Sequence, residues 1–302
     1  MPQASGSRHS IGYVPEVTFG TTPATPAFKK LRHNSSTINL SKASFQSAEL
    51  RADRMIADFR HGTRFAEGNV VGELSRTSYD DMLEAALGGT WTANVLKAGT
   101  TRKSFTFERF FADITQYFRY TGVSVDTLQV TMNTGGVVGL TFGYWGKNVA
   151  VSATPIAGAT YPLAPTTAPM DALTGVINEG GSVIAVVTAV TLNLANGLAP
   201  RFVIGSSESL EPSIGRSNLT GTVDAYFETT TLYNKFVNET SSSLSVIASD
   251  GVDTFTFLVP KLKYSGGDVP VSGEGPVSMS MPFQGLYDPT EQTNLKITRT
   301  AA

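Results

Sequence analysis

The sequence predicts a mainly β protein with short helices, built as two tandem, duplicated β-sandwich or β-barrel domains, each flanked by one α-helix. Short runs of alternating apolar residues recur along the chain, as in VSVDTLQVTM and VVGLTFGYW. Turns rich in Gly and Pro separate these runs, and only two stretches have helical periodicity. Several patterns of the first half also return in the second half in the same order, which indicates a repeat.

The first helical pattern lies in residues 67–91, after a strand with Gly72 at its centre. Thr77 or Ser78 is expected to cap the helix, with Asp80 and Asp81 in its first turn, and Gly88 to end it. Its apolar residues recur at helical spacing and predict one buried face. They are Tyr79, Met82, Leu83, Ala86 and Leu87.

The second helical pattern lies in residues 216–244 and follows a strand centred on Gly221. Residues 229–231 are three threonines that can cap this helix. Its apolar stripe is weaker and consists of Leu232, Tyr233, Phe236 and Val237.

Three further pairs of segments support the repeat. Residues 36–45 match 189–198, residues 104–111 match 254–262, and residues 134–146 match 274–287. The shift from Gly72 to Gly221 is 149 positions, close to half of the 302 residues. We therefore expect a tandem duplication.

The expected domains follow from this repeat and from the positions of proline. Residues 1–35 are predicted to form an extended N-terminal arm, because Pro15, Pro23 and Pro26 forbid a helix there. The first domain spans 36–150, with a long loop at 46–68 and later strands near 103–111, 115–121, 125–133 and 137–145. A Pro/Thr/Gly-rich connection at 151–182 leads to the second domain, 183–302.

Composition narrows the function classes. Charged residues make up 16% of the chain, below the roughly 25% typical of soluble domains, as expected where much surface is covered in an assembly. Residues 1–150 hold 16 Lys/Arg and 12 Asp/Glu, a net charge of +4, which leaves −6 for residues 151–302. The chain has no basic tail, so its composition does not predict tight nucleic-acid binding. The N-terminus has no apolar leader and the longest apolar run is about 12 residues, so we expect a cytoplasmic product with no membrane partner.

No catalytic, cofactor or metal motif is present. The chain has no cysteine, and its three histidines do not have the spacing of a metal site or a triad. Two weak carboxylate pairs leave a carbohydrate-active enzyme as a rival hypothesis: Glu108 with Asp113, and Asp224 with Glu228. We expect no enzyme, no cofactor and no metal.

The loop at residues 46–68 carries an unusual mixture of fixed charges and is longer than its counterpart in the second half. A solvated loop explains it, and so does a loop that reaches a neighbouring ring or subunit. The candidate contact residues are Glu49, Arg51, Asp53, Arg54, Asp58, Arg60, Arg64 and Glu67. Reversing the charges of Arg54 and Arg60 together is expected to block assembly.

Several segments, taken in order, resemble one family. They are IGYVPEVTFGTTPA, LRHNSSTINL, AELRADR, GNVVGELSRTSYDDMLEAALGGTW, VTLNLANGLAPRFVIGS and GRSNLTGTVDAYFETTTLYNKF. This order is similar to that of the tail tube, or major tail, proteins of long-tailed bacteriophages. The resemblance covers residues 11–287 and implies a β-sandwich or barrel flanked by a helix.

The resemblance also implies a role. Such subunits form stacked rings, a tube through which the genome passes into the host. With two domains per chain, we expect three chains to close a pseudo-hexameric ring. The implied partners are other copies of the chain, other tail proteins (tape measure, tail terminator and tip) and double-stranded DNA passing through the lumen. The implied location is the virion tail, assembled in the bacterial cytoplasm. Another β-rich virion or surface protein, such as a fibre, decoration protein or adhesin, is the alternative.

Overall fold

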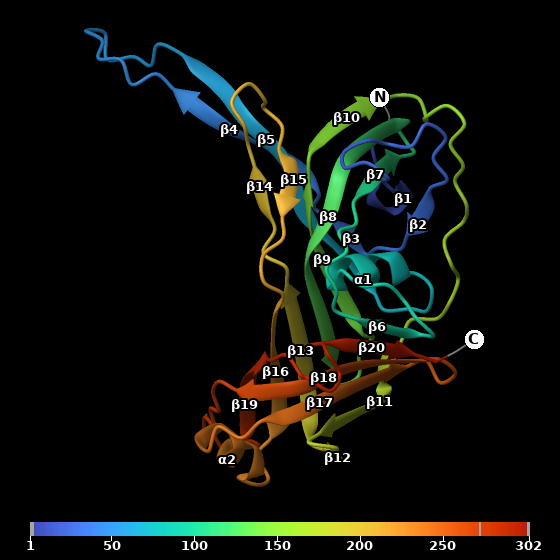
Figure 1. Ribbon diagram of the computed structural model, residues 1–302, viewed down its shortest axis with the longest axis vertical. Coiled ribbons are helices and arrows are strands. Elements are labelled where there is room, and N and C mark those ends of the chain that lie inside the picture. The colour runs from blue at the N-terminus through green and yellow to red at the C-terminus, as the bar shows by residue number, and fades with distance from the viewer. Residues whose placement is uncertain (1–2, 272, 301–302) are drawn as a thin grey trace.

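A computed structural model describes residues 3–271 and 273–300 (Figure 1). The chain is mainly β, as the sequence predicted. Its helices are α1 (Asp80–Leu87) and α2 (Thr231–Val237), and a short 3-10 turn lies at Gly6–Arg8. The strands of the first half are β1 (His9–Pro15), β2 (Lys29–Leu31), β3 (Ser35–Ser36), β4 (Asn39–Gln46), β5 (Phe59–Glu73), β6 (Val95–Lys97), β7 (Phe105–Phe111), β8 (Gln116–Asn133), β9 (Gly139–Gly146) and β10 (Asn148–Ser152). Those of the second half are β11 (Asp171–Glu179), β12 (Ser182–Val183), β13 (Val187–Ala195), β14 (Ala199–Arg201), β15 (Leu210–Ser213), β16 (Asn218–Tyr226), β17 (Ser242–Ser249), β18 (Thr254–Tyr264), β19 (Ser278–Gly285) and β20 (Lys296–Arg299).

The long strand β8 joins two parts of the sheet. Its first half pairs with β7 and β10, and its second half pairs with β9 and β13. The register shifts between these halves mark β-bulges, which bend a strand. The sequence had predicted two separate strands, near 115–121 and 125–133. Because β8 pairs with β13 of the second half, one sheet continues through both halves of the chain.

The two halves pair their strands in the same order. In the first half the order is β4-β5-β9-β8-β7-β1, and β10 also pairs with β8. In the second half it is β13-β16-β19-β18-β17-β11, and β20 also pairs with β18. Each series has one helix between its second strand and the hairpin that follows.

A single cluster of buried side chains runs through both halves. Helix α1 buries Met82, Leu83, Ala86 and Leu87, and Tyr79 lies beside it, so the predicted face is confirmed. Helix α2 buries only Leu232, and Tyr233 and Val237 are exposed. Within the described residues no helix is long and apolar enough to cross a bilayer.

The predicted helix caps were wrong in part. The N-cap of helix α1 is Tyr79, one or two residues later than the expected Ser78 or Thr77. No side-chain hydrogen bond caps the helix. The Ser78 hydroxyl instead accepts a hydrogen bond from Ser75. The end was predicted correctly, because Gly88 has φ 63°, the left-handed conformation that glycine adopts without strain.

Several expected segment boundaries differ from the structure. Residues 9–15, assigned to an extended arm, form β1, where Ile11 and Tyr13 are buried against β7. Residues 59–68 of the expected long loop belong to β5, so the loop is limited to 47–58. Residues 171–179 of the expected connection form β11, which pairs with β17. These segments alternate apolar and small residues too weakly for their pairing to be read without the partner strand.

In two cases, segments matched by sequence do not occupy strands with the same place in the pairing order of the two halves. Residues 104–111 fall in β7 and their sequence match, 254–262, falls in β18, whereas the pairing order sets β7 opposite β17. Gly221 pairs with Phe283 in β19, and the residue with that place in β5 is Gly68, which pairs with Tyr144, rather than Gly72. Alternating aromatic residues fit any strand that faces an aromatic core, so the motif alone does not identify the strand.

Candidate assembly surfaces

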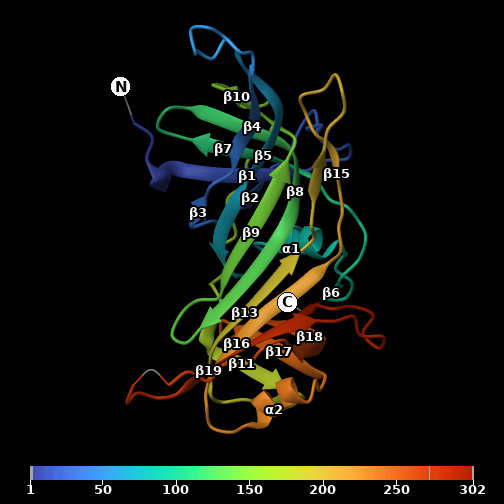
Figure 2. The ribbon, with the colours of Figure 1, turned by 90° about the vertical axis from the view of Figure 1, so that its left-hand side faces the viewer.

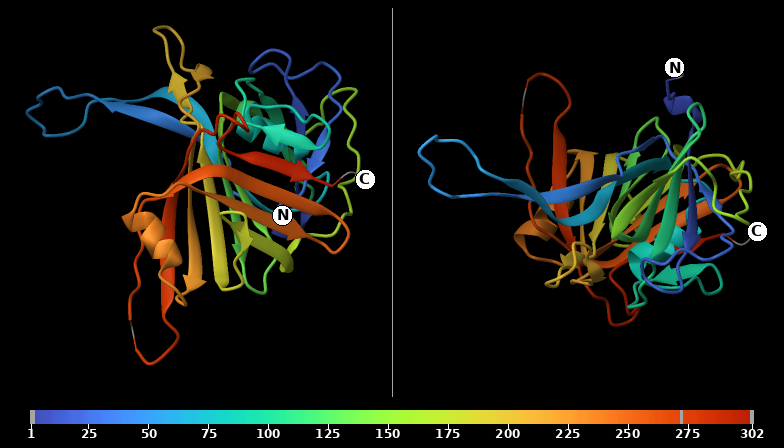
Figure 3. Two further views of the ribbon diagram at one scale, coloured as in Figure 1. Left: turned by 60° about the horizontal axis from the view of Figure 1, so that its bottom comes forward. Right: turned by 90° about the horizontal axis from the view of Figure 1, so that it is seen from above.

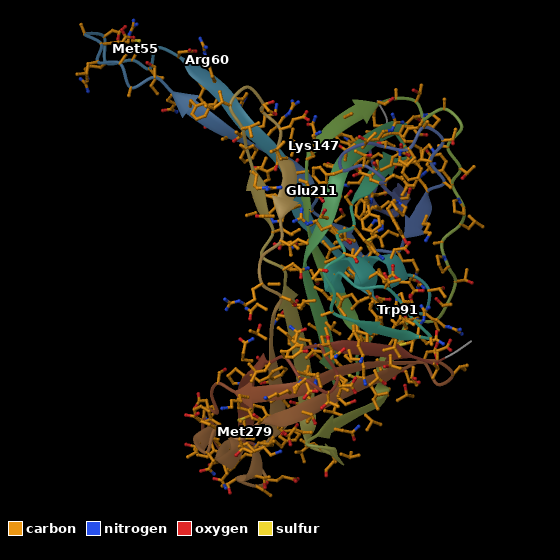
Figure 4. The ribbon with its side chains drawn as sticks, in the orientation of Figure 1. Met55, Arg60, Trp91, Lys147, Glu211 and Met279 are labelled. Carbon is orange, nitrogen blue, oxygen red and sulfur yellow. The ribbon has the colours of Figure 1, made fainter. Side chains whose placement is uncertain are left out.

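Strands β4 and β5 form a hairpin that projects far from the body of the molecule (Figures 1 and 3). The cross-strand pair Gln46 and Phe59 ends the ladder, and the tip, residues 47–58, extends beyond it. Met55 and Arg60 lie on this projection in Figure 4. Five large apolar side chains on the hairpin are exposed: Phe45, Leu50, Met55, Ile56 and Phe59. Such a concentration of exposed apolar side chains is typical of a surface that contacts another protein.

The charged residues of the tip pair with one another at short range. Arg51 and Asp53 are 2.7 Å apart, and Arg60 and Asp58 are 2.7 Å apart. The hydrogen bond from Arg51 lowers the pKa of Asp53. Since these pairs are exposed to solvent, they contribute little to the stability of the isolated chain.

The base of the hairpin is held by the second half of the chain. Arg64 Nη2 lies 2.7 Å from Glu208 Oε1, and the Arg64 backbone N–H donates to the Ser207 carbonyl. The amide of Asn148 also donates to Glu208, and Lys147 Nζ lies 3.6 Å from it. Glu208 lies in the turn between β14 and β15, so this second hairpin lies against β5 (Figure 4).

The predicted contact residues therefore separate into three groups. Glu49, Arg51, Asp53, Arg54, Asp58 and Arg60 lie on the tip and on the strand ends that carry it. Arg64 lies at the base against Glu208, and Glu67 lies inside the sheet, between Asn39 and Trp145. The sequence reading missed Glu208, which is far from Arg64 in sequence. It also missed the apolar side chains of the tip, because it attended to their charged neighbours.

Two of the strand edges without a neighbouring strand in the described part of the chain belong to β4 and to the segment after β18. Strand β4 pairs only with β5, so its other edge presents open backbone groups. The second edge follows β18, where Ser265 and Asp268 bond to β19 on one side, through Pro282 and Ser280. Figure 3 shows the loop that contains these residues projecting beyond β18 and β19.

One face of the continuous sheet carries mainly uncharged polar side chains. Strands β9, β8 and β13 lie side by side in Figure 2, with no helix in front of them. The cross-strand pairings join residues of this face into rows. One row is Glu73, Gly139, Thr131, Thr191, Thr222 and Pro282, and the next is Val71, Thr141, Gln129, Asn193, Thr220 and Gln284. The second row continues from Gln284 to Lys263 in β18, whose ammonium lies 3.7 Å from Glu239.

Of the two carboxylate pairs considered for catalysis, Glu108 and Asp113 are each bound to other groups. Glu108 is buried and lies 2.7 Å from Arg119, its cross-strand neighbour. Asp113 contacts Arg8 and accepts the backbone N–H of Ser5. No cluster of possible metal ligands occurs among residues 3–271 and 273–300.

Two histidines form part of the core border. His9 Nδ1 and His33 Nε2 are 2.8 Å apart, and Arg109 Nε donates to His9 Nε2. Burial, with Arg109 close by, lowers the pKa of His9 to about 4.

Together these features define a mainly β protein with open strand edges and an apolar, projecting hairpin, as is typical of a chain that pairs with further copies. The chain belongs to the phage tail tube protein family, whose model matches residues 6–285. No curated protein matches it closely enough to be counted. The resemblance stated from the sequence is therefore confirmed at the level of the family, and the chain is a structural component of the phage tail.

Proposed function

We propose that this protein polymerises as stacked rings of three chains and forms the tail tube through which DNA passes into the host. The observation that carries the proposal is the strand-pairing order, which occurs twice in one chain. Two such units per chain make a ring of three chains equivalent to a ring of six units. The proposal includes a tandem duplication, with each unit flanked by one of the two helices.

The uncovered sheet face suits the inner wall of such a tube. Its rows consist mainly of Thr, Asn and Gln side chains, and the one lysine that continues them, Lys263, lies beside Glu239, so the face presents little positive charge to the phosphates of DNA. A basic wall would bind the phosphates and release their counterions, and so would retain the DNA. Tape measure, tail terminator and tip proteins are the further partners we propose, with assembly in the host cytoplasm.

The test is negative-stain electron microscopy of the purified protein, with class averages of end-on views. Hollow tubes or rings with three chains and six similar lobes are expected. Six whole chains per ring would contradict the duplication. Compact particles that do not stack at any protein concentration would favour a fibre, decoration protein or adhesin instead.

A further inference from the structure

We infer that strand β4 of one chain pairs with residues 266–271 of the next chain, opposite Asp268, and that this pairing closes the ring. The inference rests on the proposed ring and names its contact. Its basis is the junction between the two halves, where β13 pairs with the second half of β8. That junction shows, within one chain, how the edge strand of one unit pairs with the sheet of the other.

The pairings identify which residues correspond in the two units. In the first unit Tyr144 pairs with Gly68, and in the second Phe283 pairs with Gly221. One residue before each glycine, Glu67 pairs with Asn39 and Thr220 pairs with Asn193. Asn39 of β4 therefore corresponds to Asn193 of β13. The sequence agrees, since residues 37–40 read TINL and residues 191–194 read TLNL.

The acceptor strand is identified in the same way. Thr141 pairs with Gln129 in the first unit. Three residues before Tyr144 and Phe283 lie Thr141 and Ser280, and Ser280 bridges to Asp268. Asp268 thus takes the place of Gln129.

Within the chain, Asn193 pairs with Gln129, and their side chains are joined by a 2.8 Å hydrogen bond. The same contact between chains sets Asn39 opposite Asp268. It also sets the buried Ile38 opposite the partly buried Val269, and Leu40 opposite Gly267, so the apolar sides of the two segments coincide.

In both segments, alternate backbone groups face away from the chain's own neighbouring strand and toward the proposed partner. The Thr37 N–H donates to Asn69 in β5, so the backbone groups of residues 38 and 40 face the other edge. There the Ile38 carbonyl accepts from Arg109 and Tyr120, and the Leu40 N–H donates to the Asn39 side chain; pairing with the next chain would replace these contacts. On the acceptor, the Asp268 N–H donates to Ser280 in β19, so residues 267, 269 and 271 point outward. Pro270 has no N–H to donate, but like Asp268 it faces β19 of its own chain, so the partner strand loses no hydrogen bond there.

The acceptor is incomplete in the single chain. Strand β8 continues as a regular strand to Asn133, with β13 beside it, whereas β18 ends at Tyr264. Beyond Tyr264 the ladder to β19 continues through the Ser265 N–H bond to Pro282 and the bridge at Asp268. An added strand would supply the missing bonds and extend β18.

Charge and the hairpin support the same contact. Strand β4 belongs to the half with net charge +4 and the acceptor to the half with −6, which favours this orientation of approach. Hairpin β14–β15 follows β13 and lies against β5 of the first unit. The apolar tip at 47–58 follows β4 in the same manner and would lie against the second half of the neighbouring chain.

Cysteine cross-linking tests the contact, since the chain has no cysteine of its own. The variant Asn39→Cys/Asp268→Cys places two thiols at a non-hydrogen-bonded pair, where the Cα atoms of neighbouring strands are about 4.5 Å apart, within disulfide range. After mild oxidation of assembled protein, a covalent ladder ending at three chains is expected on a non-reducing denaturing gel.

Two variants calibrate the reaction. Asn193→Cys/Gln129→Cys should form the equivalent bond inside one chain and show the yield of a correct pair. Asn39→Cys/Val252→Cys, with its second thiol on an exposed turn, should form no ladder.

Tubes that assemble from the 39/268 variant without a ladder would overturn the strand assignment and leave the proposed function intact. Absence of rings from the wild-type protein would instead remove the proposed function. Hydrogen exchange gives a second readout, since the amides of Gly267, Val269 and Val271 should exchange slowly only in tubes.

Discussion

At the scale of single residues, the most informative side chain is Glu108. Sequence reasoning could consider it only as a possible catalytic carboxylate, because its partner is eleven residues away on the next strand. The structure places it in the core, within 2.7 Å of Arg119, whose guanidinium also donates to the Thr154 carbonyl. A buried carboxylate with such a partner stabilises one arrangement of β7 against β8.

Replacing Glu108 with alanine should destabilise the chain strongly, because Arg119 would be left as a largely buried charge without its partner. The expected loss is about 3–5 kcal/mol in the free energy of unfolding, measured by urea denaturation of the unassembled protein. Arg60→Ala, which breaks an exposed pair, is the matched control and should leave stability nearly unchanged. Equal effects of the two substitutions would show that the Glu108 pair contributes no more than a surface pair.

At the scale of elements, the β4–β5 hairpin carries both charged and apolar side chains, and only the charged ones were recognised from the sequence. Its charges were visible, and they led to the expectation of a contact loop. In the structure these charges pair locally, while the apolar side chains of the tip have nothing to pack against within the chain. We therefore expect apolar burial to supply most of the contact energy and the charges to orient it.

The variant Leu50→Ser/Met55→Ser/Ile56→Ser should fold normally but assemble at least tenfold more weakly, measured as the protein concentration needed for ring formation. Val252→Ser, at an exposed apolar position on the β17–β18 turn, is the control. Arg54→Glu/Arg60→Glu is expected to block tube growth by placing like charges at the contact. Wild-type assembly by both tip variants would exclude the tip from the interface.

At the scale of the whole molecule, the continuous sheet separates an apolar core face from a polar face whose two central rows are mainly Thr, Asn and Gln, with Lys263 at the end of one of them. Only the pairing of β8 with β13 makes this face continuous across the two halves. We expect it to line the lumen, where weak interaction with DNA favours rapid passage.

Lysines introduced at Thr131, Thr191 and Thr222, which neighbour one another across three strands, should give tubes that bind double-stranded DNA. The binding should weaken steeply with added salt, because each phosphate contact releases counterions. Thr→Gln at the same positions controls for side-chain length and should bind none. Binding is measured by the fluorescence anisotropy of a labelled DNA fragment. Tubes of the lysine variant that do not bind DNA would show that this face does not line the lumen.

The sequence by itself determined what depends on local pattern. The periodicity of residues 79–87, the glycine at 88 and the alternating runs in β7, β8 and β9 gave the mainly β class and the first helix with its buried face. The order of the quoted segments gave the family. These features are readable because each depends on neighbours within a few positions.

Features that depend on a partner strand became visible only in the folded chain. The tertiary structure placed residues 9–15 in the sheet, bent β8 between two sets of neighbours, brought Glu208 to Arg64, and paired Gly68 with Tyr144 and Gly221 with Phe283. Strand pairing joins residues far apart in sequence, and many alternating segments fit many partners equally well. The correspondence of Asn39 with Asn193, on which the proposed ring contact depends, therefore became readable only from the register of the sheet.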